Sequence, residues 1–190
     1  NLNDIIKLRR NVKPKLFTGD LIPDAIVTEI LSTANWAPTH GYTEPWRFVV
    51  FSGASLKILA EFQAELYKSS TSVELYKELK YTKLKSTHLL ASHIIALVVH
   101  KSINTPIPLV EEIAATSCGV QNILLSAASK NIAVHWTSGG MTYNPEMKTY
   151  LGFDAKDQVL GFLYLGISPT EVNKEGRRLS SIDEKITWMK

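Results

Sequence analysis

Fixed positive charge gathers close to the start of the chain, where Arg9, Arg10 and Lys13 surround the short amide of Asn11. A guanidinium group stays charged at physiological pH and binds phosphate oxygens in pairs, and an amide adds a neutral hydrogen bond. The same residue types also occur as solvated surface charge, which is the commoner case. We therefore interpret residues 9–13 as a candidate anion site. Whether they bind an anion depends on which groups the fold places beside them.

A second candidate is the sequence WTSGG at residues 136–140, which ends an expected strand. Hydroxyl groups and glycines in such a bend expose backbone N–H groups where a ligand can approach closely. An ordinary turn would use the same glycines, so this pattern does not identify a ligand. The candidates in this segment are Trp136, Thr137, Ser138 and Gly139.

The third candidate is His40, in a loop stiffened by Pro38 and Pro45 just before the apolar run 46–51. Proline disfavours helix in the residue before it, and the β-branched and aromatic run predicts a strand buried on both faces. Stiff polar loops at strand ends often hold ligands, although most only connect elements. A single polar ring on a constrained backbone is therefore a weak indication of a site.

Other familiar chemistry is missing from the sequence. The patterns GxGxxG, GxxxxGK[ST], HExxH and CxxC are absent, and Ser138 does not lie in a GxSxG sequence. The histidines lack the helical spacing of metal ligands, so no metal site is expected. Cys118 lies among small residues, where a thiol usually packs as a small apolar group.

Composition limits the classes of partner. The net charge is +3 with both signs interspersed, which is not typical of a nucleic-acid-binding surface. The longest apolar run, 94–99, is far shorter than the roughly 20 residues that span a bilayer, so no membrane partner is expected. The single cysteine excludes an intrachain disulfide and favours a soluble protein of the cytoplasm. The tail carries a second basic cluster at Lys174, Arg177 and Arg178.

The elements that position these candidates follow from hydrophobic periodicity. Strands separated by helices predict α+β or three-layer α/β packing, and we expect one domain over residues 1–190. Small residues on most faces of 110–130 predict a buried central helix, with a dimer axis through it as the alternative. Helices are expected at 2–10, 24–35, 54–85, 110–130 and 145–151, and strands at 46–51, 94–100, 132–136 and 158–166.

In this order, the segments resemble the flavin-dependent nitroreductase family, and in particular its small bacterial members. The spacing AP-x(6)-PWRF and the series W-x-S-G…LG…LGFLYLG are specific together, and the resemblance covers nearly the whole chain. It implies an α+β three-layer sandwich with a mixed or antiparallel sheet, and an intertwined homodimer with FMN at the interface. The segments that carry it are IIKLRRNVK at 5–13, NWAPTHGYTEPWRFVVF at 35–51, QNILLSAA at 121–128, AVHWTSGGM at 133–141 and YLGFDAKDQVLGFLYLGISP at 150–169.

The resemblance also implies roles for residues. The segment 9–11 matches the family motif R-R-S and would hold phosphate and ribityl oxygens, with the pyrimidine edge near Lys13. The N-terminal cluster of one subunit would face the bend at 136–139 of its twin, and Arg177 is the expected phosphate contact in the tail. No side chain is assigned a catalytic role. The implied cofactor-binding residues are Arg9, Arg10, Asn11, Lys13, Trp36, His40, Trp136, Thr137, Ser138, Gly139 and Arg177.

The implied activity is that of an NAD(P)H oxidoreductase. Hydride from NADH or NADPH would pass through flavin N5 to a nitroaromatic, quinone or similar acceptor in a ping-pong cycle. Asn11, Tyr42 and Glu44 depart from the usual Ser, Asn and Gln of the family. Because of these departures, a flavin-binding module with little turnover is the alternative. A helix-mediated interaction domain is a third possibility, which rests only on 110–130.

Overall fold

The computed structural model of the chain describes residues 1–169 and 176–190. Its centre is a four-stranded sheet in the order β1-β2-β4-β3, in which every neighbouring pair is antiparallel. The expected α+β class is therefore confirmed, with the antiparallel arrangement rather than a parallel one. The strands are β1 (Trp46–Ser52), β2 (His93–Val99), β3 (Ala133–Thr137) and β4 (Gln158–Gly166).

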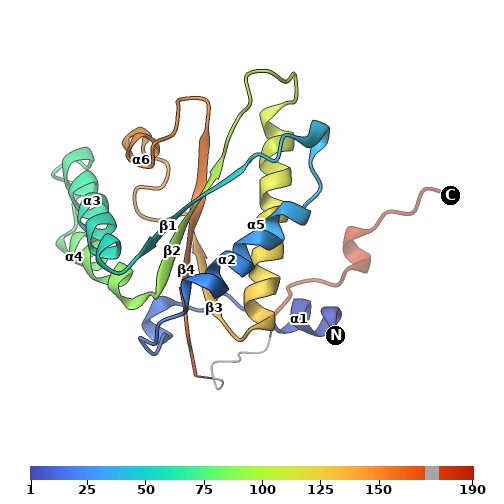
Figure 1. Cartoon of the computed structure of the whole chain (residues 1–190), viewed down its shortest axis with the longest axis horizontal. Helices are drawn as coiled ribbons and strands as arrows, with labels where there is room; N and C mark the ends of the chain where they lie inside the picture. Colours follow the sequence, from blue (N-terminus) through green and yellow to red (C-terminus); the bar gives the residue numbers. More distant parts are fainter. Residues whose placement is uncertain (170–175) are drawn as a thin grey trace.

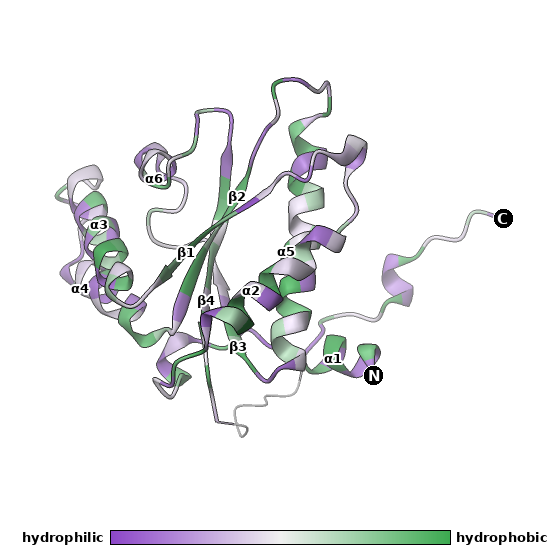
Figure 2. Ribbon diagram, in the orientation of Figure 1, coloured by the Kyte–Doolittle hydropathy of each residue, from purple (hydrophilic) through white to green (hydrophobic). Residues whose placement is uncertain are grey.

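Helices cover both faces of this sheet, as Figure 1 shows. One apolar cluster joins the sheet to α2 and α5, and a second joins its other face to α3 and α6. Figure 2 shows the hydrophobic strands enclosed between helices that carry both polar and apolar residues. The three-layer expectation is thus confirmed. The helices are α1 (Leu2–Leu8), α2 (Asp24–Ser32), α3 (Ala54–Ser70), α4 (Glu78–Thr87), α5 (Leu109–Ser129) and α6 (Pro145–Tyr150).

The two longest apolar runs occupy different places in the sheet. All of β2 is buried, because β1 and β4 pair with its two edges and a helical layer covers each of its faces. The expectation that the run 46–51 is buried on both faces was wrong, since β1 is an edge strand with Arg47 and Val50 exposed. β-Branched and aromatic residues favour any half-covered pleated surface, so their pattern does not separate an edge strand from a central one.

The expected helix over 54–85 is two helices. The first ends in a run of serine and threonine at 69–72, where side chains compete with the backbone for hydrogen bonds. Buried Tyr67 fixes the turn, because its hydroxyl accepts the N–H of Lys77 at 2.9 Å. The second helix, α4, folds back along α3 and buries none of its own residues. It is therefore a cover over this face of the sheet.

Helix α5 is buried on one face only. Its buried residues, such as Ala115, Gly119 and Ile123, face α2 and the sheet. The opposite face, which includes Cys118 and Gln121, is exposed in the single chain. The predicted central helix is thus buried on the face toward α2 and the sheet and exposed on the other, and the dimer alternative stays a prediction.

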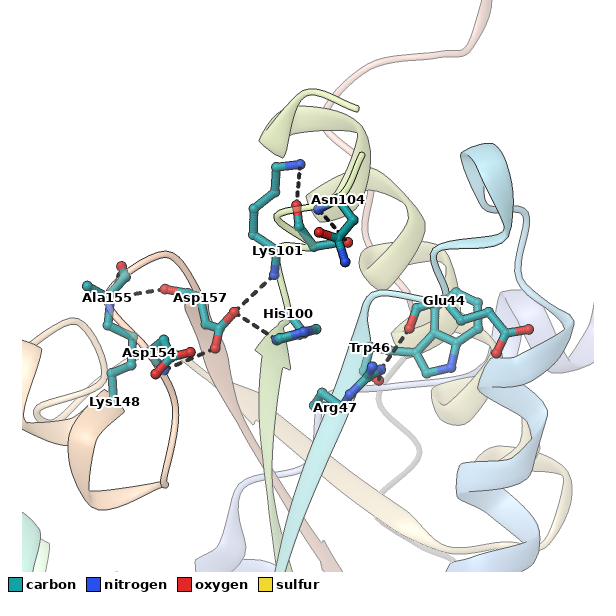
Figure 3. Close-up of polar contacts among 11 residues, drawn as sticks. Glu44, Trp46, Arg47, His100, Lys101, Asn104, Lys148, Asp154, Ala155 and Asp157 are labelled. Atoms are coloured by element: carbon teal, nitrogen blue, oxygen red, sulfur yellow. Dashed lines mark hydrogen bonds and ion pairs between the residues drawn. The ribbon is translucent and has the colours of Figure 1, made fainter. Parts of the chain in front are cut away.

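One end of the sheet is held together by Asp157 (Figure 3). Its buried carboxylate accepts the backbone N–H groups of Lys101 at 3.0 Å and Asp154 at 3.1 Å, and it contacts His100 Nδ1 at 3.0 Å. Lys148 donates to the backbone carbonyl of Asp157 at 3.0 Å. Because these partners come from three different segments, a single carboxylate aligns the loop after β2 with the start of β4.

Strand β4 has an irregularity at Gly161. Leu97 pairs with Gly161 while Val98 pairs with Val159, so Leu160 is an extra residue in β4. Gly161 has φ +146°, and a Cβ at this position would lie 2.6 Å from the carbonyl oxygen of Thr137. The bulge thus brings the end of β3 unusually close to β4.

Within the described residues, no helix is long and apolar enough to cross a membrane. The same part of the chain contains no group of three or more His, Cys, Asp or Glu side chains that could hold a metal ion.

Candidate functional site

The N-terminal candidate segment docks on β3. Val12 donates its N–H to the carbonyl of Val134 at 2.9 Å, and Asn11 forms a parallel bridge with the same residue. The amide of Asn11 accepts the N–H of Trp136 at 2.7 Å and donates to its carbonyl at 3.4 Å. Asn11 therefore joins residues 9–13 to the bend at 136–140. Both the oxygen and the nitrogen of its amide are used in this contact, so the amide is less available to a ligand.

This docking corrects one expectation. We expected the N-terminal cluster of one subunit to face the bend of its twin, but the structure brings the two segments together within one chain. The physical reason is the parallel bridge, which lets the segment extend the sheet edge beside β3. Sequence order gave no signal of this pairing, because the two segments are 125 residues apart.

Guanidinium groups gather on one side of this junction. Burial first, and then the charges of Arg10 and Arg178, lower the pKa of Arg9 below its usual value. Arg9 and Arg10 line a cavity of about 360 Å³ with Val134 and Ala128, which we call the arginine cavity. Three like charges repel one another, so an anion at this place would stabilise the cluster.

The tail reaches this cluster through Arg178, and the expected phosphate contact of Arg177 stays a prediction. Arg178 lies close enough to Arg9 to affect its pKa, and no comparable interaction of Arg177 is found among the described residues. The carbonyl of Arg177 instead accepts a hydrogen bond from Arg178 at 2.9 Å. The basic residue beside Arg9 is therefore Arg178. Lys174, from the same cluster, lies outside the described residues.

A second cavity, of about 320 Å³, lies on the other side of β3, under α4. We call it the glutamine cavity, after Gln63 of α3. Thr137, Gly139 and Gly140 of the bend form part of its wall, so two of the expected residues line it. Ser138 and Trp136 do not. The remaining lining residues are Lys80, Lys83, Leu84, Thr87, His88, His135 and Tyr164.

Two polar atoms of the glutamine cavity lack a hydrogen-bond partner. Gln63 Nε2 and His135 Nδ1 are buried, and neither meets a donor or acceptor among the described residues. Buried polar atoms in native proteins almost always have a partner. Burial first, then the charges of Lys13 and Lys83, lower the pKa of His135, so its ring is neutral at pH 7. The cavity is therefore built for a polar ligand or ordered water.

The opposite wall of this cavity has its hydrogen bonds satisfied. The hydroxyl of Tyr164 lies 3.1 Å from His88 Nε2, and His88 Nδ1 lies 2.8 Å from the carbonyl of Leu84. These distances fit a neutral His88 that donates to Leu84 and accepts from Tyr164. Burial lowers the pKa of His88 to about 4 and raises the pKa of Tyr164. Both side chains stay neutral at pH 7 and act as structural supports.

The loop candidates lie elsewhere. His40 Nδ1 is 2.6 Å from a carboxylate oxygen of Glu111, and Trp36 is 87% exposed. Neither residue lines either of the two cavities. Tyr42 and Glu44 have φ values of +53° and +42°, a backbone conformation that costs non-glycine residues energy and often marks functional loops. A single chain does not bring this loop to the other candidates.

The model of the Nitroreductase family matches residues 6–167. The chain belongs to the nitroreductase family. The Bacillus subtilis protein YfhC, named for an inferred NAD(P)H nitroreductase activity, is 30% identical over 99% of this chain and 94% of its own length.

Solved nitroreductase structures share the fold. A nitroreductase-like family protein from Bacillus cereus has a TM-score of 0.82 at 25% identity, covering 100% of this chain and 96% of that one. The FMN-dependent nitroreductase NfnB from Mycobacterium smegmatis, in complex with NADPH, has a TM-score of 0.74 at 18% identity, with coverage of 99% and 97%. The predicted membership of the family is confirmed.

A hydrogen-bonded Ser–His–Asp series in this nitroreductase has a structural role. Ser92 Oγ lies 2.9 Å from His93 Nδ1, and His93 Nε2 lies 2.9 Å from Asp24. Such a series could suggest a serine hydrolase. However, Ser92 is 4% exposed, its oxygen accepts the N–H of Ile22 at 2.7 Å, and it lines neither cavity. The series ties α2 to the start of β2.

Sequence reasoning missed the polar residues of the glutamine cavity. It assigned no site residue to the expected helix 54–85, whereas α3 supplies Gln63 and α4 supplies Lys83. One signal was available, because Gln63 lies on the same helix face as Leu56, Leu59 and Leu66, which are buried. A polar residue in an apolar stripe requires a partner, and here the chain itself does not supply one.

Proposed function

We propose that this chain is an FMN-dependent NAD(P)H oxidoreductase of nitroreductase type. The observation that supports this most is the path of residues 9–13 along β3. At one end Arg9 and Arg10 line the arginine cavity, and at the other the charge of Lys13 reaches His135 in the glutamine cavity. A ligand that lies along residues 9–13, at the sheet edge formed by β3, would meet guanidinium groups at one end and a polar environment at the other. FMN has a phosphate and a polar ring to match them.

The residues present fit this cofactor. The arginine cluster suits a phosphate, because guanidinium groups form charge-assisted pairs with its oxygens. The unpartnered Gln63 Nε2 and His135 Nδ1 suit the carbonyl and N–H groups of a pyrimidine ring. The bend at 136–140 offers backbone groups at the wall of the same cavity.

Bound FMN would supply hydride transfer between a reduced nicotinamide and an electron acceptor such as a nitroaromatic or a quinone. The chain's own residues would hold and polarise it. Arg9, Arg10 and Arg178 neutralise a phosphate, while Lys13 and Lys83 add positive potential around His135. Because His135 is neutral at pH 7, this positive potential comes from the two lysines and not from the ring. No side chain needs to act as a nucleophile.

A homodimer is part of the proposal. Three apolar side chains of α1, those of Leu2, Ile6 and Leu8, are exposed, as is one face of α5. The described tail carries exposed Leu179 and Trp188 and runs past α1 away from the sheet (Figure 1). Apolar surface of this extent favours association with a second copy.

The loop with Trp36 and His40 would then border the partner's flavin. Light scattering should give twice the chain mass.

A spectrum followed by anaerobic reduction tests the activity. The purified protein, supplied with FMN, should be yellow with an equimolar amount of bound flavin. NADH or NADPH added without oxygen should bleach this colour, and a nitroaromatic or quinone should restore it. Protein that binds no FMN contradicts the proposal. Yellow protein that neither nicotinamide bleaches supports a flavin-binding module with little turnover.

An Arg9→Ala variant tests the phosphate assignment. We expect FMN to bind about 30-fold more weakly, because charge-assisted hydrogen bonds to a phosphate are lost. Riboflavin has no phosphate, so its affinity should stay close to that of the wild type. Fluorescence titration measures both. Lys57→Ala, which removes an exposed cation on α3, is the matched control and should bind FMN like the wild type. Equal loss for FMN and riboflavin would contradict this role for Arg9.

A further inference from the structure

Gln63 occupies an unusual position for an amide. It lies on the buried face of α3, is 2% exposed, and lines the glutamine cavity. Its Nε2 has no acceptor among the described residues, although leaving such a donor buried and unpaired is costly. A methionine or leucine would fill the same space without that cost. The amide thus favours an occupant of the cavity that brings an acceptor.

The neighbouring backbone is adapted to this side chain. Gly140 has φ +69°, and a Cβ there would lie 2.8 Å from Gln63 Oε1. The carboxamide therefore takes the space that any larger residue at 140 would need. The backbone of α3 carries the amide and the bend packs against it, so the amide is held in the wall of the cavity.

The other groups around the cavity define the chemistry of the acceptor. His88 and Tyr164 already satisfy each other, and His135 is neutral. Lys80 and Lys83 are exposed lysines at the cavity wall. The wall thus combines a buried donor, a neutral imidazole and cations, but no carboxylate. This combination suits a neutral or partly negative carbonyl oxygen and disfavours a cation.

We propose that Gln63 is a cofactor-positioning residue, whose side-chain amide donates a hydrogen bond to a carbonyl oxygen of the flavin pyrimidine ring. This inference rests on the proposed FMN function and adds a residue from α3 to the site. Gln63 selects and orients the ring, whereas the arginine cluster binds the phosphate. The two contributions are separable because FMN and riboflavin share the ring and differ in the phosphate.

The test is a comparison of Gln63→Met with the wild type, using the full chain freed of flavin. Methionine keeps the volume and removes the amide. Titration with FMN and with riboflavin should show affinity lowered about tenfold for both, the effect of one hydrogen bond. The melting temperature without flavin should be equal to or higher than that of the wild type, since an unpaired buried donor is removed. Loss of flavin affinity without loss of stability distinguishes positioning from a structural role.

The outcomes that overturn the inference are distinct from those that overturn the function. Gln63→Met protein that binds both flavins within twofold of the wild type refutes the role of Gln63. So does a variant that loses affinity for FMN but not for riboflavin, or one whose melting temperature falls along with its affinity. Wild-type protein that binds neither flavin refutes the proposed function itself. The control Gln158→Met changes a half-buried glutamine at the start of β4, outside both cavities, and should leave riboflavin affinity unchanged.

Discussion

A Gly161→Ala variant is expected to lose about 4 kcal/mol of unfolding free energy, because it combines backbone strain with a clash in a packed region. The new Cβ would lie 2.6 Å from the carbonyl oxygen of Thr137 and 2.9 Å from Trp136 Nε1. The φ of +146° at Gly161 is also one that alanine rarely adopts. Relief of the clash requires the backbone at 137 to move away from β4.

This movement should also affect the site, since Thr137 lines the glutamine cavity and Trp136 holds Asn11. FMN affinity is therefore expected to fall together with stability. Urea unfolding at a fixed protein concentration measures the loss, because dimer stability depends on concentration.

Gly152→Ala is the matched control for this prediction. Gly152 has φ +81°, and no atom lies within 4 Å of its added Cβ. Only the backbone strain applies there, so we expect a loss of about 1 kcal/mol and unchanged FMN binding. Similar losses of unfolding free energy in the two variants would show that the close approach of β3 to Gly161 does not contribute to the effect of the substitution.

Acidification is expected to remove about 3 kcal/mol of stability through His88, the amount that corresponds to its pKa shift. Burial lowers the pKa of His88 from 6.5 to about 4 in the folded chain. The unfolded chain therefore takes up a proton first as the pH falls. The contribution of neutral His88 is complete above pH 6.5 and is lost as the pH falls to about 4.

A His88→Gln variant isolates the pH-dependent contribution of His88 to stability, because glutamine can hydrogen-bond but does not titrate in this range. We expect its stability to be lower than that of the wild type at pH 7 and to decline less steeply with acid. Urea unfolding at a series of pH values measures the two slopes. Tyr164→Phe is the control: it keeps His88 buried, so it should retain most of the steep decline. Parallel slopes for His88→Gln and the wild type would contradict the assignment.

Local patterns in the sequence were sufficient to predict most of the helices and strands. The strand Gln158–Gly166 was predicted with its observed bounds, and the helix 145–151 was predicted to within one residue. These succeed because proline, glycine and hydrophobic periodicity act over a few neighbouring residues. The edge position of β1 and the turn between α3 and α4 were missed, since both depend on what packs against the segment.

For the site, too, some features followed from the sequence and others only from the tertiary structure. By itself the sequence determined the chemical types at 9–13 and 136–140 and, through motifs along the whole chain such as AP-x(6)-PWRF, the family. Only the tertiary structure decided that both segments meet in one chain, that Arg178 is the tail residue beside Arg9, and that Gln63 faces the same cavity as the bend. The physical reason is that residue type is a local property. A hydrogen bond across 125 residues, or an unpaired amide at a cavity wall, depends on how distant segments pack.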